Sequence, residues 1–274
     1  MPLFFRGGDD IATGPLLFGV YEQELKDFIE HLAAHGFGDF LLDIGANIGL
    51  TSCQSGRAFG EIHMFEPNPN AARVLRINRD LALRGCKVVI HDYGLGAREE
   101  TLRLHVPRHN WGGAFIRSAE NSYSAQLLSS KDGLGDFDAR NYDVVEVPMR
   151  PAREVLAELF GSLAARGKRR GVIKIDVEGY ERFVIESIMA TLPSDLACFI
   201  VFENWDPELD LQALAACRAP AAKVYALHQD KDRFPGAPRW LNSLLRAVRG
   251  GFETALQAVD GGHAVGTVVF ELRP

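Results

Sequence analysis

A run of nine residues, LLDIGANIG at positions 41–49, constrains this chain more than any other feature of its sequence. The apolar residues that lead into it predict a buried strand, and a helical pattern follows the two glycines, Gly45 and Gly49. Glycine permits a positive φ and lets a ligand approach the backbone closely. At the start of a doubly wound α/β sheet, such a turn binds a nucleotide at the carboxyl edge of the strands.

The same turn contains an acidic residue, Asp43. It lacks the third glycine of the dinucleotide fingerprint and the lysine of a P-loop. A carboxylate beside the glycines is a poor neighbour for a pyrophosphate and a good one for a cation. The turn therefore predicts a nucleotide-like ligand that carries positive charge in place of phosphate.

A second motif, EIHMFEPN at positions 61–68, predicts the next parallel strand with Glu66 at its end. Pro67 ends that strand because proline has no N–H to donate to the ladder. An acidic residue at this point can accept two hydrogen bonds from a ribose diol. The alternative is a strand-capping glutamate that faces solvent.

The third motif, GVIKIDVEGY at positions 171–180, reads as a central strand buried on both faces. Its charged residues alternate with apolar ones, so Lys174, Asp176 and Glu178 are predicted to face the same side. Buried charges are rare unless they are paired or bind something. A structural Lys174–Asp176 pair is the alternative to a functional site.

In this order, DIGANIG, FEPN and KIDVEGYE resemble the FkbM-type family of methyltransferases that use S-adenosylmethionine (SAM), over about Phe18 to Asn204. SAM carries a sulfonium and an ammonium group and no phosphate, in agreement with the acidic turn. The resemblance implies the class I methyltransferase fold, an α/β, doubly wound, mostly parallel sheet of seven strands. It also implies O-methylation, often of sugars or other hydroxyl-bearing natural products, without naming the acceptor.

The resemblance further implies six cofactor-binding residues: Asp43, Gly45, Asn47, Glu66, Asn68 and Asp92. Asp43 and Gly45 would hold the methionine end, Glu66 the ribose, and Asp92, which follows the third strand, the adenine amine. The two asparagines would contact the cofactor at its carboxylate and its adenosine edge. For both of them, capping a helix is the alternative.

For catalysis, the expected residues are Asp176, Glu178 and Glu203, which fall at the ends of two neighbouring strands. A sugar hydroxyl needs a general base or a metal that lowers its pKa. Asp176 would act as the base with Glu178 and Glu203 in support, or the three would bind Mg²⁺ or Ca²⁺. His105 and His109 are secondary candidates for the base.

Composition limits the class of protein. The chain is 47% hydrophobic and 24% charged, with a net charge of -6, so it lacks the basic footprint of a nucleic-acid binder. Its four cysteines form no C-x-x-C pair. No apolar run is long enough for a signal peptide or a transmembrane helix. These features predict a cytoplasmic protein with reduced thiols.

Alternating strand and helix patterns predict a helical segment at 1–39 followed by a methyltransferase domain at 40–274. Two segments interrupt the alternation. Residues 107–143 follow an extra strand and are expected to form a lid loop. Residues 230–262 are expected to form a helical insertion that packs on the domain or on a homodimer partner, or lies on a membrane surface.

The sequence thus predicts a SAM-dependent O-methyltransferase that acts on a small-molecule or glycan acceptor. A SAM-binding module without catalysis is one alternative. A nucleic-acid methyltransferase is another, disfavoured by the acidic charge balance and by the absence of an N-P-P-Y-like motif. An NAD-dependent oxidoreductase is disfavoured by the missing third glycine.

Overall fold

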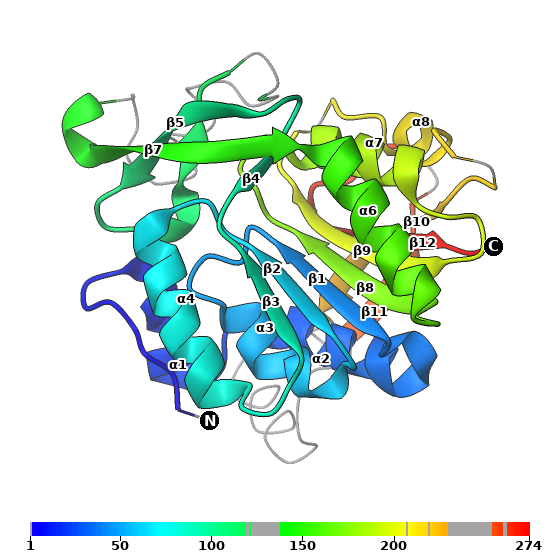
Figure 1. Cartoon of the computed structure of the whole chain (residues 1–274), viewed down its shortest axis with the longest axis horizontal. Coiled ribbons are helices and arrows are strands. Elements are labelled where there is room, and N and C mark those ends of the chain that lie inside the picture. The colour runs from blue at the N-terminus through cyan, green and yellow to red at the C-terminus, as the bar shows by residue number, and fades with distance from the viewer. Residues whose placement is uncertain are drawn as a thin grey trace, which may run out of the picture.

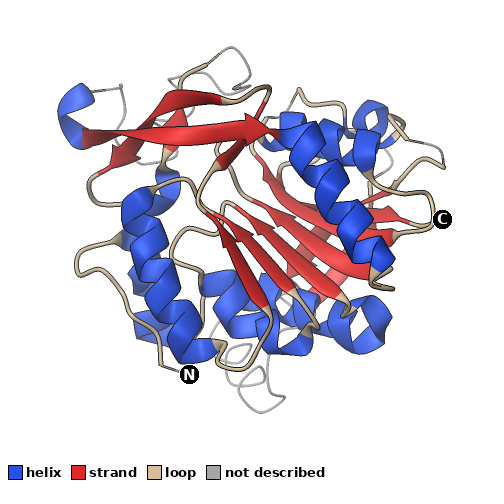
Figure 2. Cartoon of the chain, viewed as in Figure 1, coloured by secondary structure: helices blue, strands red, loops and turns tan. Residues whose placement is uncertain are grey.

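The computed structural model describes residues 2–118, 121, 138–206, 208–218, 220–229, 254–259 and 262–274. Within these residues, Figure 1 and Figure 2 show helices on both faces of one large sheet. The α-helices are α1 (Thr13–Phe18), α2 (Gln23–Leu32), α3 (Leu50–Ser55), α4 (Pro69–Ala82), α6 (Ala152–Ala165), α7 (Glu181–Thr191) and α8 (Leu211–Ala215). The strands are β1 (Phe40–Ile44), β2 (Ile62–Phe65), β3 (Val88–His91), β4 (Gly94–Gly96), β5 (Glu100–Pro107), β6 (Phe115–Ile116), β7 (Tyr142–Pro151), β8 (Arg170–Ile175), β9 (Ala197–Asn204), β10 (Lys223–Gln229), β11 (Thr254–Ala258) and β12 (Gly266–Leu272).

The large sheet has the strand order β11-β10-β12-β9-β8-β1-β2-β3. Five neighbouring strands, from β9 through β8 and β1 to β3, pair in parallel. β12 runs antiparallel to both β9 and β10. The predicted doubly wound and mostly parallel α/β sheet is therefore confirmed, with a mixed edge.

The predicted number of seven strands is wrong, because eight strands of this sheet fall within the described residues. The additional strand, β11, pairs with β10 at the sheet edge and lies within the segment 230–262, which the sequence predicted to be helical. Its sequence, TALQA, is rich in helix-forming residues, which hides an edge strand from propensity arguments.

The alternation along β1 sends side chains to two separate cores, one on each face of the sheet. Leu42 packs with residues of α6 and α7, such as Leu156 and Ile185. Its neighbour Leu41 packs with residues of α2 and α4, including Ile29. All of these side chains are almost fully buried. Helices thus cover both faces of the sheet. We therefore expect a ligand to bind at the strand ends.

A second sheet, with the order β4-β7-β5-β6, lies across the carboxyl ends of the parallel strands (Figure 1). Its main pairing is the long antiparallel contact between β5 and β7. The extra strand expected just before residue 107 is β5, which is part of this sheet. This second sheet covers the edge of the large sheet at which a ligand is expected to bind.

Two predicted features lie largely outside the described residues. These are most of the lid loop, at 119–120 and 122–137, and most of the helical insertion, at 230–253 and 260–261. In the part of the chain that the structure describes, no helix is both long and apolar enough to span a bilayer.

Candidate active site

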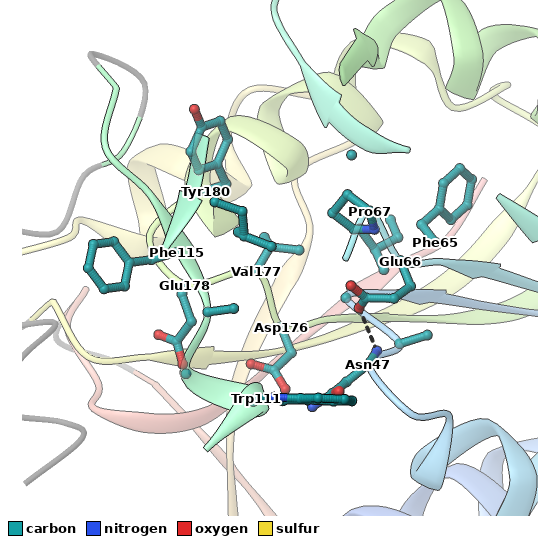
Figure 3. A pocket seen from close by; sticks show the side chains of 18 of the residues that line it. Asn47, Phe65, Glu66, Pro67, Trp111, Phe115, Asp176, Val177, Glu178 and Tyr180 are labelled. Atoms are coloured by element: carbon teal, nitrogen blue, oxygen red, sulfur yellow. Dashed lines mark hydrogen bonds between the residues drawn. The ribbon is translucent and has the colours of Figure 1, made fainter. Parts of the chain in front are cut away.

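A cavity of about 390 Å³ opens at the carboxyl ends of β1, β2 and β8. Its walls come from the ends of these strands, from the second sheet and from a 3-10 helix at Trp111–Gly113. Figure 3 shows Glu66 and Asn47 close together in this cavity, with Asp176 and Glu178 on the segment that follows β8. Ligands of open α/β sheets bind at this edge.

The glycine turn after β1 forms one wall of the cavity through residues 45–47. Gly45 has a φ of +81°, and a Cβ atom there would lie 1.8 Å from the carbonyl oxygen of Asp176. The N–H groups of Gly45 and Ala46 both donate to the carbonyl of Phe65, each over 3.0 Å. The turn is therefore wedged between the ends of β2 and β8, and only glycine fits.

Glu66 ends β2 and borders the cavity as the sequence predicted. One of its oxygens accepts the backbone N–H of Asn47 and the other that of Asn68, both over 2.7 Å. Burial raises the pKa of this carboxyl to about 7, although the two N–H groups oppose the shift. Each carboxylate oxygen can accept a further hydrogen bond.

Asn47 also borders the cavity, in a left-handed conformation with a φ of +50°. Both polar atoms of its side chain are buried, and neither has a hydrogen-bond partner within the described residues. An unpaired buried amide is costly unless a ligand pairs with it. The amide is thus available to a ligand in the cavity, and the helix-cap alternative finds no support because the N-cap residue of α3 is Gly49.

Asp43 does not line the cavity but lies beneath the turn, fully buried. Its Oδ2 accepts the Ser52 hydroxyl over 2.6 Å, and its Oδ1 lies 3.3 Å from Nζ of Lys174. The same Nζ donates to the carbonyl of Gly45 over 3.1 Å and lies 3.3 Å from Oδ2 of Asp176.

Lys174 therefore links the glycine turn to the end of β8. Burial alone would lower its pKa, but the carboxylates of Asp43 and Asp176 outweigh burial and raise it. The side chain stays charged at neutral pH. The structural Lys174–Asp176 pair is present, and it belongs to the wall of the cavity.

The three predicted catalytic carboxylates all border the cavity. Asp176 follows directly after β8, whereas Glu178 lies in the turn beyond it, with a φ of +28°. Glu178 thus reaches the cavity from a turn and not from the strand alternation. Glu203, near the end of β9, accepts the Trp205 indole N–H over 2.9 Å. Within the described ranges, no three acidic, His or Cys side chains are grouped closely enough to hold a metal ion.

Besides Asp43, two more of the predicted cofactor residues do not border the cavity. Asn68 caps α4, because its Oδ1 accepts the N–H of Asn70 over 3.0 Å. Asp92 is half exposed and forms an ion pair with Arg76 on the surface. Tyr93, the next residue, lines the cavity instead. Helix capping and a surface ion pair account for both positions without a ligand.

Aromatic side chains contribute to the wall of the cavity. Phe65, Tyr93 and Trp111 line the cavity, and the Arg6 guanidinium lies 4.6 Å from the centre of the Trp111 ring. Trp111 therefore anchors its segment and faces the cavity at once. The two secondary bases, His105 and His109, do not border it.

Sequence reasoning missed Glu22, which precedes α2 and lines the same cavity. The residue as a whole is exposed at the cavity mouth, yet burial of its carboxyl group raises its pKa to about 7. Asp176 and Glu203 add to the increase, and Lys174 opposes it. A single acidic residue before an amphipathic helix gives no signal of such a role, because it looks like a solvated surface residue.

Comparisons with known proteins identify relatives of this chain. A model of the methyltransferase FkbM domain matches residues 43–215, which include the glycine turn, Glu66 and Asp176. The chain is 29% identical over 196 residues to methyltransferase sdnD of Sordaria araneosa, a match that covers 69% of this chain and 74% of that protein.

Two solved structures are similar at low identity. The O-methyltransferase TomG from Streptomyces achromogenes, involved in tomaymycin synthesis and solved with SAM, has a TM-score of 0.44 and 11% identity, covering 100% of this chain and 93% of that one. The O-methyltransferase from Bacillus cereus in complex with SAH has a TM-score of 0.41 and 12% identity, covering 93% of this chain and 82% of that one.

Proposed function

The chain belongs to the FkbM family of SAM-dependent methyltransferases, and we propose that it methylates a hydroxyl oxygen of a sugar-containing or natural-product acceptor. SAM supplies a methyl group on a positively charged sulfur. The protein has to hold the two ends of the cofactor, orient the acceptor oxygen and give its proton a destination. Residues around the cavity suit each of these tasks.

Cofactor binding is proposed to rest on the glycine turn and the end of β2. The Glu66 carboxylate accepts the ribose hydroxyls, and the unpaired Asn47 amide pairs with the methionine carboxylate. Gly45 lets the cofactor lie against the backbone. Asp43 acts from beneath by holding Lys174 and the turn in place, which replaces the direct contact expected from the family resemblance.

The observation that carries the proposed chemistry is the position of Asp176. Its carboxylate borders the same cavity as Glu66 and Asn47, and only one of its oxygens is paired with Lys174. The other oxygen is placed to accept a hydrogen bond from an acceptor hydroxyl. Aligning the attacking oxygen lowers the barrier of an in-line displacement.

Glu178 and Glu203 are proposed to bind further hydroxyl groups of the acceptor. Both border the cavity near Asp176, and carboxylates are strong acceptors for sugar hydroxyls. The face of Trp111 suits an apolar patch of a sugar ring, since its indole offers a large contact area at little entropic cost.

The test is product identification. The purified full chain is incubated with SAM labelled at the methyl carbon and with a panel of hydroxylated glycosides and polyketides. We expect a labelled methyl ether, with a methyl resonance typical of carbon bound to oxygen, and one equivalent of S-adenosylhomocysteine. Label found only on nitrogen or carbon across the panel would contradict the proposal.

A further inference from the structure

A second cavity of about 260 Å³ adjoins the first, and its walls come from the start of α2 and the ends of β8 and β9. Among the described residues, the two cavities share four wall residues: Glu22, Lys174, Asp176 and Glu203. All four are charged. The border between the two cavities is therefore the most polar part of the site, and a group that reaches it from either side meets these side chains.

The backbone at Glu22 is held in an unusual conformation at this border. Its φ of +43° and ψ of +66° are left-handed, which is rare for a residue with a Cβ atom. It sits at the N-cap position of α2, yet its side chain makes no capping hydrogen bond. Strain of this kind persists where the surroundings enforce it, commonly at functional sites. The conformation directs the carboxylate to the cavities and not to the helix end.

Each of the other two carboxylates at the border has one side-chain partner. Asp176 pairs with Lys174 over 3.3 Å, and Glu203 accepts the Trp205 indole over 2.9 Å. Glu22 faces Asp176 and Lys174 from β8, Glu203 from β9, and the hydroxyl of its neighbour Tyr21. Because the two negative neighbours outweigh the one positive neighbour, Glu22 binds a proton more tightly than an ordinary glutamate does.

From this geometry, and resting on the proposed O-methylation, we infer that Glu22 is the general base that receives the acceptor's hydroxyl proton, while Asp176 orients that hydroxyl. In the step, the acceptor oxygen gains a bond to the methyl carbon. The carbon–sulfur bond breaks with its electron pair left on sulfur, and the hydroxyl proton passes to a carboxylate oxygen of Glu22. The product is a neutral ether beside a neutral thioether.

A base is most effective when its proton affinity matches the working pH. The raised pKa of Glu22, about 7, arises from burial first and then from Asp176 and Glu203. At neutral pH a large fraction of the Glu22 carboxyl is therefore ionised and able to accept a proton. Its proton affinity is also higher than that of an ordinary glutamate. An acceptor seated in the second cavity would present its hydroxyl to Glu22 across the border.

The experiment compares the full chain with Glu22→Gln, Glu22→Asp and Glu30→Gln. Glu30 lies on α2, pairs with Lys26 over 2.8 Å and lines neither cavity, so it is the matched control. We expect Glu22→Gln to lower kcat by about 10²–10⁴-fold. The SAM dissociation constant from calorimetry should change less than about twofold, and Glu22→Asp should recover part of the rate.

Two further measurements separate a base from a structural residue. In the wild type, kcat should rise with pH through about 7, and the residual rate of Glu22→Gln should lack this rise. Carbon NMR of ¹³C-labelled glutamate in the SAM-free chain should show two carboxyls that titrate near neutrality, those of Glu22 and Glu66, and only that of Glu66 should remain in Glu22→Gln. A methyl ether formed by Glu22→Gln at the wild-type rate would overturn the role of Glu22 and leave the O-methylation standing. Absence of any methyl ether from the wild type would overturn both.

Discussion

The backbone N–H of Asn47 donates to Oε2 of Glu66 over 2.7 Å, which ties the glycine turn after β1 to the end of β2. The other oxygen of Glu66 holds the N–H of Asn68 at the start of α4. One carboxylate thus fixes two backbone segments and faces the cavity at the same time. Its removal should affect both cofactor binding and folding.

We expect Glu66→Ala to weaken SAM binding by about 2–4 kcal/mol, or about 30- to 700-fold, through the loss of two ribose hydrogen bonds. It should also lower the free energy of unfolding, because two N–H groups lose their acceptor. Titration calorimetry and urea unfolding measure the two effects. Glu66→Gln has the same size and serves as the control, with a smaller loss in both. SAM affinity unchanged in Glu66→Ala would refute the ribose assignment.

SAM affinity should depend on pH through Glu66. The ribose hydroxyls donate to the ionised carboxylate, and burial raises its pKa to about 7. Affinity is therefore expected to rise as the pH passes from about 6 to 8 and to level off above that range. Calorimetric titrations at several pH values test this, and the Glu66→Gln variant should lose the dependence. An equal pH slope in both proteins would assign the dependence to another group.

Local sequence patterns predicted the sheet core and part of the site. The glycine turn, the acid at the end of β2 and the acid after β8 depend on segments of a few residues, and the parallel order brings their ends to one edge. Asp43 was expected in the turn but lies in strand β1, and its burial and its contact with Lys174 depend on the register between β1 and β8.

Features set by contacts between distant segments were not predictable from local patterns. Glu22 reaches the site because α2 packs against the sheet face formed by side chains of β1 and β9. No local sequence pattern encodes this packing. Asp92 follows its strand as expected, but the side chain turns to Arg76 on the neighbouring helix α4. The edge strand β11 was missed for the same reason, since its single pairing with β10 is non-local.

The contact of Lys174 with Asp43 predicts a strong effect on stability. Lys174→Met leaves Asp43 buried without its cation, so we expect a loss of about 3–5 kcal/mol in the free energy of unfolding. In the double variant with Asp43→Asn, part of that loss should return, because no buried charge remains unpaired. A double-mutant cycle from urea unfolding measures the coupling. Additive losses in the cycle would show that the two side chains act independently.

The free energy of unfolding should also decrease at acid pH because of His91, which contacts His63. His91 hydrogen-bonds His63 over 3.1 Å, and burial, His63 and Arg150 lower the pKa of His91 to about 4. Its unfolded pKa is about 6.5, so the unfolded chain binds the extra proton between these values and stability decreases as the pH falls from 6.5 to 4. Between pH 7 and 5 the loss from His91 should be about 1–2 kcal/mol.

Because Glu66 has a raised pKa in the folded chain, it contributes in the opposite direction, with stability lost as the pH rises from 4.5 to 7. The effect of His91 is therefore read as a difference between the wild type and His91→Asn. Urea unfolding at pH 5 and 7 should show a smaller acid loss in the variant. Equal losses in the two proteins would show that His91 does not contribute to the loss of stability at acid pH.

Asp176→Asn should separate orientation of the acceptor from proton removal. The variant keeps the shape of the side chain but removes the charge that pairs with Lys174 and accepts the acceptor hydroxyl. Misalignment of the attacking oxygen should lower kcat by about 10²-fold or more, with a much smaller effect on SAM affinity. Its residual rate should still rise with pH, unlike that of Glu22→Gln. Since Lys174 already supplies a positive charge to Asp176, wild-type activity is expected to withstand EDTA. Activity lost to EDTA and restored by Mg²⁺ or Ca²⁺ would instead assign Asp176, Glu178 and Glu203 to a metal site.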